Sequence, residues 1–329
     1  MVSRARPPWP TRVARGLAFS QIGAIYVLIG IVIVFTIWVP DTFPNMATAK
    51  QILNSNAITA LAALSITIPL AARVFDLSFA YTMTLTGVVA AHFAAAGMPL
   101  VPALLLGLGS GVLVGIVNAV VVVVMRIDSF IATLATGSLI QALITMATGG
   151  QPTIAGFQYP VIYVIVVAAA MWYLLEHTSV GRRLYATGFN PDAARLAGVR
   201  VNRLRFISLI VSGSLAGAAG IVLASNISSG SPTAGTSYLL PAFAAAFLGA
   251  TQLKHGRFNA GGTLIAVLLL GTGTTGLALA NAPQWSADMF VGVVLIASLA
   301  VTGIQRRTTG ARPGLGRRVV QKMRAALNS

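Results

Sequence analysis

The sequence GRRLYATGFNPDAARLAGV, residues 181–199, lies within a polar segment, 176–205, that separates two runs apolar enough to lie in lipid. Three consecutive residues in it predict the start of a helix. Asn190 suits the N-cap, because its side chain can accept from the first free backbone N–H groups. Pro191 fits the first helical position, where its missing N–H needs no partner, and Asp192 suits the positive end of the helix dipole.

The same segment predicts where this helix ends. Gly198 is typical of a helix stop, which leaves a helix of about two turns over 191–197. So short a helix is not stable alone in water, so other parts of the protein or a partner must brace it. We interpret it as a docking element for a soluble partner. The simpler alternative is a helix that only closes a loop.

The composition identifies an integral membrane protein. Of the 329 residues, 56% are apolar and only 9% are charged, with a mean hydropathy of +0.84, whereas an ordinary soluble domain has about 25% charged residues. Cysteine is absent, which excludes disulfides and thiolate metal sites. The histidines, His92, His177 and His255, lack the spacing of metal ligands, so we expect no metal site.

The charge balance indicates how the chain is oriented. The sequence has 22 Lys and Arg residues against 6 Asp and Glu residues, which in a soluble protein would suggest a nucleic-acid partner. No loop combines basic residues with stacking aromatics, so we exclude nucleic acid. When successive loops are assigned to alternate sides of the membrane, Lys50 alone of the basic residues falls on the outer side. This positive-inside bias predicts that both termini are cytoplasmic.

The apolar runs predict an all-α, polytopic fold with about ten transmembrane helices, since a span needs about 20 apolar residues. The eighth run is only about 13 residues long, so we expect it to be tilted, broken or re-entrant. Interrupted segments in comparable positions of two halves indicate an inverted repeat, here inferred from spacing alone. The ten predicted spans are roughly 19–39, 51–72, 78–97, 100–125, 130–149, 159–176, 206–225, 239–251, 260–280 and 286–304.

These spans divide the chain into three parts. Residues 1–18 are predicted to be a cytoplasmic N-terminal segment, and 19–304 the transmembrane domain, with a cytoplasmic loop at 177–205. The basic residues of 305–329 form a cytoplasmic tail that could lie on anionic lipid headgroups or stay solvated. Rows of small residues predict tight helix packing within the domain: Gly107, Gly111 and Gly115; Gly213, Gly217 and Gly220; and Gly271, Gly273 and Gly276.

The acidic residues argue against catalysis and ion coupling. All six fall at or near predicted helix ends, where a carboxylate can cap a helix or stay hydrated. A catalytic site needs convergent acids, bases or nucleophiles, and ion-driven carriers normally keep ionisable groups at depth. The glycines of 249–262 lack the Gly-Lys-Ser/Thr of a phosphate loop, so this chain is not expected to bind nucleotide. The six are Asp41, Asp76, Asp128, Glu176, Asp192 and Asp288.

Neutral polar residues within the predicted spans are the candidates for a translocation path. Hydroxyl and amide groups that line a watery cavity suit an uncharged polar solute. The alternative is that such groups hold helices together through hydrogen bonds, which explains most intramembrane Asn and Thr residues. The candidates are Asn54, Asn56, Thr59, Tyr81, Asn118, Asn226 and Tyr238.

At several motifs the sequence resembles the permease subunits of ribose-type (simple sugar) ABC importers, which are related to branched-chain amino-acid permeases. The resemblance covers most of 45–304 and is most specific in 181–199, where the family has its coupling segment. It continues through SSGSPTAGTSYLLPAFAAAFLGAT, 228–251, through FDLSFA, 75–80, and at Gly256, Gly262 and Thr263. The coupling residues that it implies are Gly188, Asn190, Pro191, Ala193, Ala194, Arg195, Leu196 and Gly198.

The resemblance implies a type II ABC importer in the bacterial plasma (inner) membrane. Such an importer has two permease subunits, alike or different, two cytoplasmic ATPases that bind ATP, and an extracytoplasmic solute-binding protein. The permease would bind no cofactor and would be pushed by the ATPase through the helix at 191–197. Ala193, Ala194 and Ala197 would then form a small-residue face that fits a groove, with Asn190 and Arg195 at its rim.

Some positions depart from the family pattern. Arg73, Val74 and Ala80 stand where glycines are usual, Leu239 and Pro241 replace an acidic pair, and Lys254 and His255 replace small residues in a turn. These changes bear on the solute more than on coupling. The alternatives are a permease for branched-chain amino acids or nucleosides of the same superfamily, an ion-coupled secondary carrier, or a passive channel.

Overall fold

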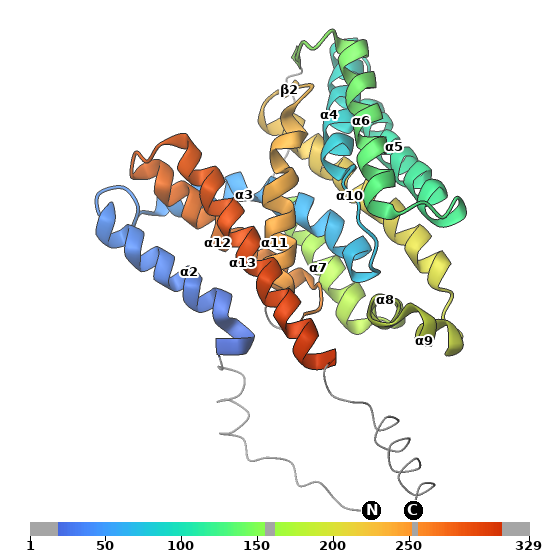
Figure 1. Cartoon of the computed structure of the whole chain (residues 1–329). Coiled ribbons are helices and arrows are strands. Elements are labelled where there is room, and N and C mark those ends of the chain that lie inside the picture. Colours follow the sequence, from blue (N-terminus) through green and yellow to red (C-terminus); the bar gives the residue numbers. More distant parts are fainter. Residues whose placement is uncertain (1–18, 155–161, 252–255, 311–329) are drawn as a thin grey trace, which may run out of the picture.

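The computed structural model describes residues 19–154, 162–251 and 256–310, and over these ranges the fold is all-α with one short strand pair, as Figure 1 shows. The predicted segment 1–18, the part of the predicted tail 305–329 that follows Gly310, and the turn at Lys254 and His255 lie outside the described residues, while 305–310 continue α13. The elements are α2 (Phe19–Trp38), α3 (Met46–Ala71), α4 (Phe79–Ala95), α5 (Leu100–Ala119), the π-helix η1 (Val120–Val124), α6 (Ser129–Thr148), β1 (Thr153–Ile154), α7 (Ile162–His177), α8 (Ser179–Phe189), α9 (Pro191–Leu196), α10 (Val201–Asn226), β2 (Ser229–Gly230), the 3₁₀ helix η2 (Ala234–Tyr238), α11 (Leu239–Thr251), α12 (Ala260–Leu279) and α13 (Gln284–Gly310).

A described helix covers most of each predicted span. Six helical segments of the described chain are long and apolar enough to cross a membrane by length and composition: Met46–Ala71, Leu100–Val124, Ser129–Thr148, Val201–Asn226, Ala234–Thr251 and Ala260–Leu279. Shorter apolar helices lie at Gly23–Trp38, Phe79–Ala95 and Gln284–Ala300. The protein is therefore a multi-pass membrane protein.

Helix α10 lies at the centre of the fold and packs against α3, α4 and α5. Its glycines allow close approach, as the sequence predicted. A Cβ added to Gly111 on α5 would lie 2.7 Å from the Gly213 carbonyl oxygen, and one added to Gly115 would lie 2.8 Å from the Leu209 carbonyl oxygen. The two backbones are thus almost in contact, which is how helices gain packing energy in lipid.

The eighth predicted span, 239–251, is the single short helix α11. Five residues of 3₁₀ helix, η2, precede the 13 residues of α11. The η2 segment is held against α4, where the Gly235 N–H donates to Thr84 Oγ1 at 3.1 Å. Helix α11 then packs against α3, α12 and α13, so the short helix is braced by protein along its length.

A non-helical link, residues 72–78, joins α3 to α4 and begins with a turn at Ala72 and Arg73. From Val74 to Ser78 the residues differ in their surroundings. Val74, Asp76 and Ser78 are buried in the bundle, whereas Phe75 and Leu77 line a cavity. Asp76 is only 1% exposed, so of the two predicted roles it is not hydrated but accepts from the Ser78 N–H at the start of α4. It lies at a helix end, but that end is inside the protein.

Candidate coupling segment and the buried link

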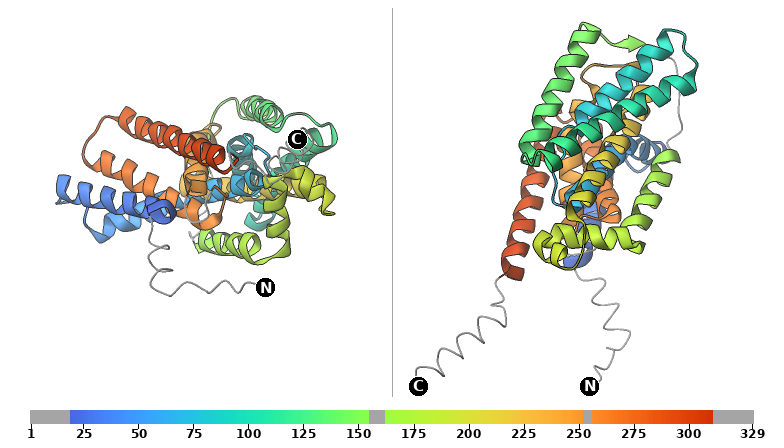
Figure 2. Two further views of the ribbon diagram at one scale, coloured as in Figure 1. Left: turned by 60° about the horizontal axis from the view of Figure 1, so that its bottom comes forward. Right: turned by 90° about the vertical axis from the view of Figure 1, so that its right-hand side faces the viewer.

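Helices α8 and α9 lie across one end of the bundle, opposite the end that carries β1 and β2 (Figure 2). Helix α8 starts after Thr178, whose Oγ1 accepts from the Gly181 N–H at 3.2 Å. The chain then leaves α8 at Phe189 and turns directly into α9. The predicted helix at 191–197 is confirmed as Pro191–Leu196, with Ala197 as its C-cap.

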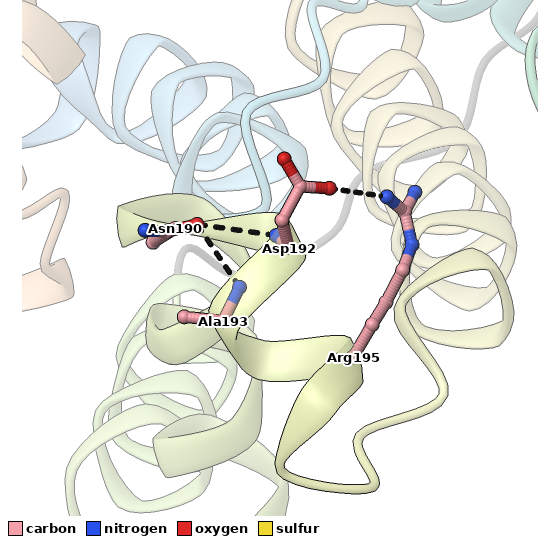
Figure 3. Close-up of polar contacts among 4 residues, drawn as sticks. All are labelled: Asn190, Asp192, Ala193 and Arg195. Atoms are coloured by element: carbon pink, nitrogen blue, oxygen red, sulfur yellow. Dashed lines mark hydrogen bonds and ion pairs between the residues drawn. The ribbon is translucent and has the colours of Figure 1, made fainter.

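The predicted cap of α9 is also confirmed. Asn190 Oδ1 accepts from the Asp192 N–H at 3.2 Å and from the Ala193 N–H at 3.1 Å (Figure 3). Arg195 pairs with Asp192 at 2.8 Å on the exposed side. Gly198 follows with φ +81°, a left-handed conformation that glycine adopts without strain. These local interactions explain why six residues can hold a helical shape.

The expected small-residue face of α9 is divided. Ala194 is 5% exposed and faces the protein, so it is not on an outer surface, whereas Ala193 and Ala197 are exposed. The side chains that protrude are larger: Leu196 is 91% exposed and Phe189 is 81% exposed. An exposed pair of large apolar residues beside charged neighbours is a typical protein contact surface.

Helix α8 touches the end of α3 through Gly188. A Cβ at this position would overlap with the carbonyl oxygen of Ala71, the last residue of α3. Arg205 of α10 donates from Nε to the next carbonyl oxygen, that of Ala72, at 3.4 Å. The first residues of the link are therefore held between α8 and α10.

A second contact joins α8 to the start of α12. The Tyr185 hydroxyl donates to the Phe258 carbonyl oxygen at 2.8 Å, and the Arg257 guanidinium lies 3.8 Å from the centroid of the Tyr185 ring. Burial, and after it the negative charge of Glu176, raises the pKa of the Tyr185 phenol. The phenol therefore keeps its proton and remains a donor in this contact.

The buried side of the link forms a cluster of hydrogen bonds, here called the polar knot, with helices α5 and α10. Asp76 Oδ1 accepts from the Ser78 N–H at 3.1 Å and from Ser78 Oγ at 2.7 Å. Asp76 Oδ2 accepts from Ser212 Oγ of α10 at 2.7 Å, and Asn118 Nδ2 of α5 donates to Ser78 Oγ at 2.7 Å. A carboxylate inside a membrane protein is costly unless it is paired or hydrogen-bonded, and here both oxygens accept from protein donors.

Helix α6 fixes the backbone of the same link. The Phe75 N–H donates to Ser129 Oγ at 3.0 Å, and the Leu77 N–H donates to Thr133 Oγ1 at 2.9 Å. The cavity that Phe75 and Leu77 line has a volume of about 730 Å³, and its other walls come from α6, α11 and α13. The link thus has a buried polar side and a side that faces a mostly apolar cavity.

The candidate path residues are dispersed. Asn118 belongs to the knot, Asn56 fills the space at Gly271 of α12, and the Tyr81 ring fills the space at Gly137 of α6. These three act in helix packing, the alternative that the sequence left open. Asn54 and Asn226 are exposed, Thr59 is buried, and Tyr238 packs partly buried against the core. None of the seven lines the 730 Å³ cavity, so their role in a path stays a prediction.

Sequence reasoning missed the partners of the link. Ser212 lies within the apolar run of α10, and Ser129 and Thr133 lie in the first turns of α6. The spacing of Ser129 and Thr133, four residues apart, places both on one helix face, and the Asp-Leu-Ser sequence marks a polar strip. Nothing in the sequence indicates that this face of α6 contacts the Asp-Leu-Ser segment, because only tertiary packing brings them together.

Comparisons with known proteins agree on one family. The model of the family described as branched-chain amino acid transport system, permease component, matches residues 48–299. The ribose import permease protein of Escherichia coli (strain K12) is 33% identical over 279 residues, which cover 78% of this chain and 87% of the relative. The fructose import permease protein of Rhizobium meliloti is 29% identical over 301 residues, which cover 84% of this chain and 83% of the relative.

A solved structure described as an inward-facing metal-chelate type ABC transporter aligns more weakly. Its TM-score is 0.47 at 14% identity, with coverage of 86% of this chain and 98% of that chain. A likeness at that level adds nothing to the sequence matches.

Proposed function

Because this chain belongs to the family of ABC importer permeases that includes the ribose import permease, we propose that it forms the path by which a sugar or a similar uncharged polar solute crosses the membrane. The relatives carry ribose and fructose by their names, which supports a sugar as the solute. The single observation that carries the proposal is the family match over 48–299, a range that contains both the link and α9.

The proposed topology has ten crossings, with α8 and α9 in the cytoplasm. Both termini, residues 1–18 and 305–329, would be cytoplasmic, as the positive-inside bias supports. The permease domain would be 19–304, with its coupling loop at 177–205 and two halves related as an inverted repeat. The membrane would be the bacterial plasma (inner) membrane.

In the proposed assembly, other subunits bind ATP, deliver the solute and complete the path. A cytoplasmic ATPase would bind ATP and dock on α9, an extracytoplasmic protein would deliver the solute, and a second permease, alike or different, would complete the path. The coupling residues would be Gly188, Asn190, Pro191, Ala193, Arg195, Leu196 and Gly198, with Ala194 as the buried anchor of α9. The chain itself would bind no metal and no cofactor.

The contacts of α8 suggest how a push on α9 would reach the path. Gly188 leaves no gap to Ala71, so a displacement of α8 would move the end of α3. The link follows α3 directly and carries Phe75 and Leu77 into the cavity. A shift of the link would therefore change the shape of the cavity, which is how ATP binding elsewhere would open or close it.

Transport in vesicles tests this function. We expect the purified chain, reconstituted with its ATPase and solute-binding protein, to accumulate a labelled sugar such as ribose when ATP is supplied. Omission of ATP or of the ATPase should abolish accumulation, and an uncoupler should not affect it. Accumulation that needs no ATP and collapses with the uncoupler would instead favour an ion-coupled carrier, with Asp76 as its buried carboxylate.

Leu196 is expected to be a main contact for the ATPase. The Leu196→Ser variant should retain the fold, since the side chain is 91% exposed. It should lower the affinity for the ATPase by about tenfold, because one large apolar anchor at the centre of an interface contributes about 1 to 2 kcal/mol. The measurement is co-purification of the ATPase with the variant. Ile154→Ser is the matched control and should co-purify normally, since Ile154 is 81% exposed and belongs to β1, which pairs with β2 at the opposite end (Figure 2).

A further inference from the structure

Four arginines line a second cavity at the α9 end of the bundle. It has a volume of about 590 Å³ and lies between the start of the link, the turn from η1 to α6, and the facing parts of α9 and α10. Among its lining residues there is one acidic side chain, Asp128. The arginines are Arg73, Arg126, Arg195 and Arg205.

The charges of this cavity are not balanced by the described protein. Asp128 already accepts from the Phe130 and Ile131 N–H groups as the cap of α6. Arg195 has its partner in Asp192, but Arg73 and Arg126 have no ion-pair partner within the described ranges. Arg195 and Arg73 are also close enough to Arg205 to repel it, and the attraction of Asp192 is the smallest of these charge effects. An anion in the cavity would relieve this repulsion.

The backbone holds two of the arginines in an unfavourable conformation. Arg73 has φ +59° and Arg126 has φ +61°, in the left-handed region that costs a residue with a Cβ about 1–2 kcal/mol. Glycine would adopt these angles freely. Both residues are nevertheless arginines that line the cavity, which indicates a role beyond the turn itself.

The cavity opens beside a surface that suits acyl chains. Its wall includes Val122 and Val123 of η1, and the neighbouring Val124 and Ile131 are 65% and 64% exposed. We propose that this cavity binds a phosphate group at the membrane surface, with the arginines on the phosphate oxygens and the η1 valines along the chains of an anionic phospholipid. Basic pockets between transmembrane helices bind such headgroups, and the arginine fork matches phosphate geometry.

The proposal would also place the ligand where coupling occurs. Arg195 lies on α9, Arg205 contacts Ala72, and Arg73 begins the exposed part of the link and lines both cavities. A bound phosphate would therefore contact α9, α10 and the link at the same time. The inference uses the contacts of the cavity and holds for any solute that the permease carries.

Binding is tested on the full chain in an uncharged detergent. Phosphatidylglycerol is expected to raise the thermal midpoint of the wild type, and phosphatidylcholine is not. Arg126→Gln should weaken phosphatidylglycerol binding about fivefold, the loss expected for one basic residue at a headgroup. Arg126→Gly should weaken it equally while the lipid-free midpoint is unchanged or higher, because glycine relieves the backbone strain. Arg203→Gln, an exposed arginine of α10 outside the cavity, is the matched control and should bind as the wild type does.

A parallel titration with inorganic phosphate separates the two sources of the group. Stabilisation by phosphatidylglycerol alone assigns the site to lipid, and stabilisation by both assigns it to a phosphate anion of either source. Equal binding of phosphatidylglycerol by the wild type, Arg126→Gln and Arg126→Gly overturns the proposal. So does loss of the ATPase from Arg126→Gln with lipid binding intact, which would assign the arginines to an acidic protein partner.

Discussion

Replacement of Gly188 by alanine is expected to abolish ATP-driven uptake while the ATPase remains bound. The added Cβ would overlap with the Ala71 carbonyl oxygen, a backbone atom that cannot move without the end of α3. Either α8 tilts away, which breaks the contact that passes motion to the link, or the end of α3 shifts, which displaces the link from its resting position. A misplacement of about 1 Å far from a site can reduce its rate by about a hundredfold. The measurements are labelled-sugar uptake and ATP hydrolysis in proteoliposomes.

The control separates decoupling from misfolding. Gly109→Ala on α5 meets no atom within 4 Å, so its uptake and thermal midpoint should equal those of the wild type. Gly188→Ala should still be inserted in the membrane and should still co-purify the ATPase through α9. Uptake near the wild-type rate in Gly188→Ala would mean that α8 and α3 move independently.

Replacement of Asp76 by alanine is expected to produce the largest loss of stability. The change leaves Ser78 and Ser212 without their acceptor in the interior, and each buried polar group left unpaired costs about 1–3 kcal/mol. The link would lose its position as well, so uptake should fall with the thermal midpoint. Thermal unfolding in detergent measures the first effect, and proteoliposome uptake measures the second.

A substitution that keeps the shape refines this test. Asp76→Asn retains one acceptor oxygen, and since serine hydroxyls can rotate to accept from its amide, the fold should lose less stability than in Asp76→Ala. The exposed Asp41→Ala variant should behave as the wild type. An unchanged midpoint in Asp76→Ala would show that the knot contributes little to the fold.

Local signals in the sequence were sufficient to predict the helices α9 and α11. The cap at Asn190, the proline at the first helical position and the glycine at Gly198 predicted α9 to within one residue. The run at 239–251 was predicted with the bounds that α11 has. Caps and apolar runs depend on neighbouring residues, so one sequence contains the information for them.

The buried link could not be predicted, because its environment is built from distant residues. A carboxylate that follows a helix looks the same in a sequence whether that helix ends in water or inside a bundle. Asp76 is buried because α5, α6 and α10 surround the end of α3. The direction of Ala194 was missed for a related reason, since a helix of six residues is too short for a pattern of apolar positions to show which side is covered.

Residues of the polar knot alternate with cavity-lining residues along the link, so we expect the link to tolerate little change in its length. Within the link, Asp76 and Ser78 belong to the knot, whereas Phe75 and Leu77 lie on the wall of the cavity. Insertion or deletion of one residue would reverse this order, so that phenylalanine would face the buried serines and the carboxylate would face the apolar cavity. We therefore expect a one-residue insertion or deletion between the two helices to be tolerated less well than a single substitution in this segment.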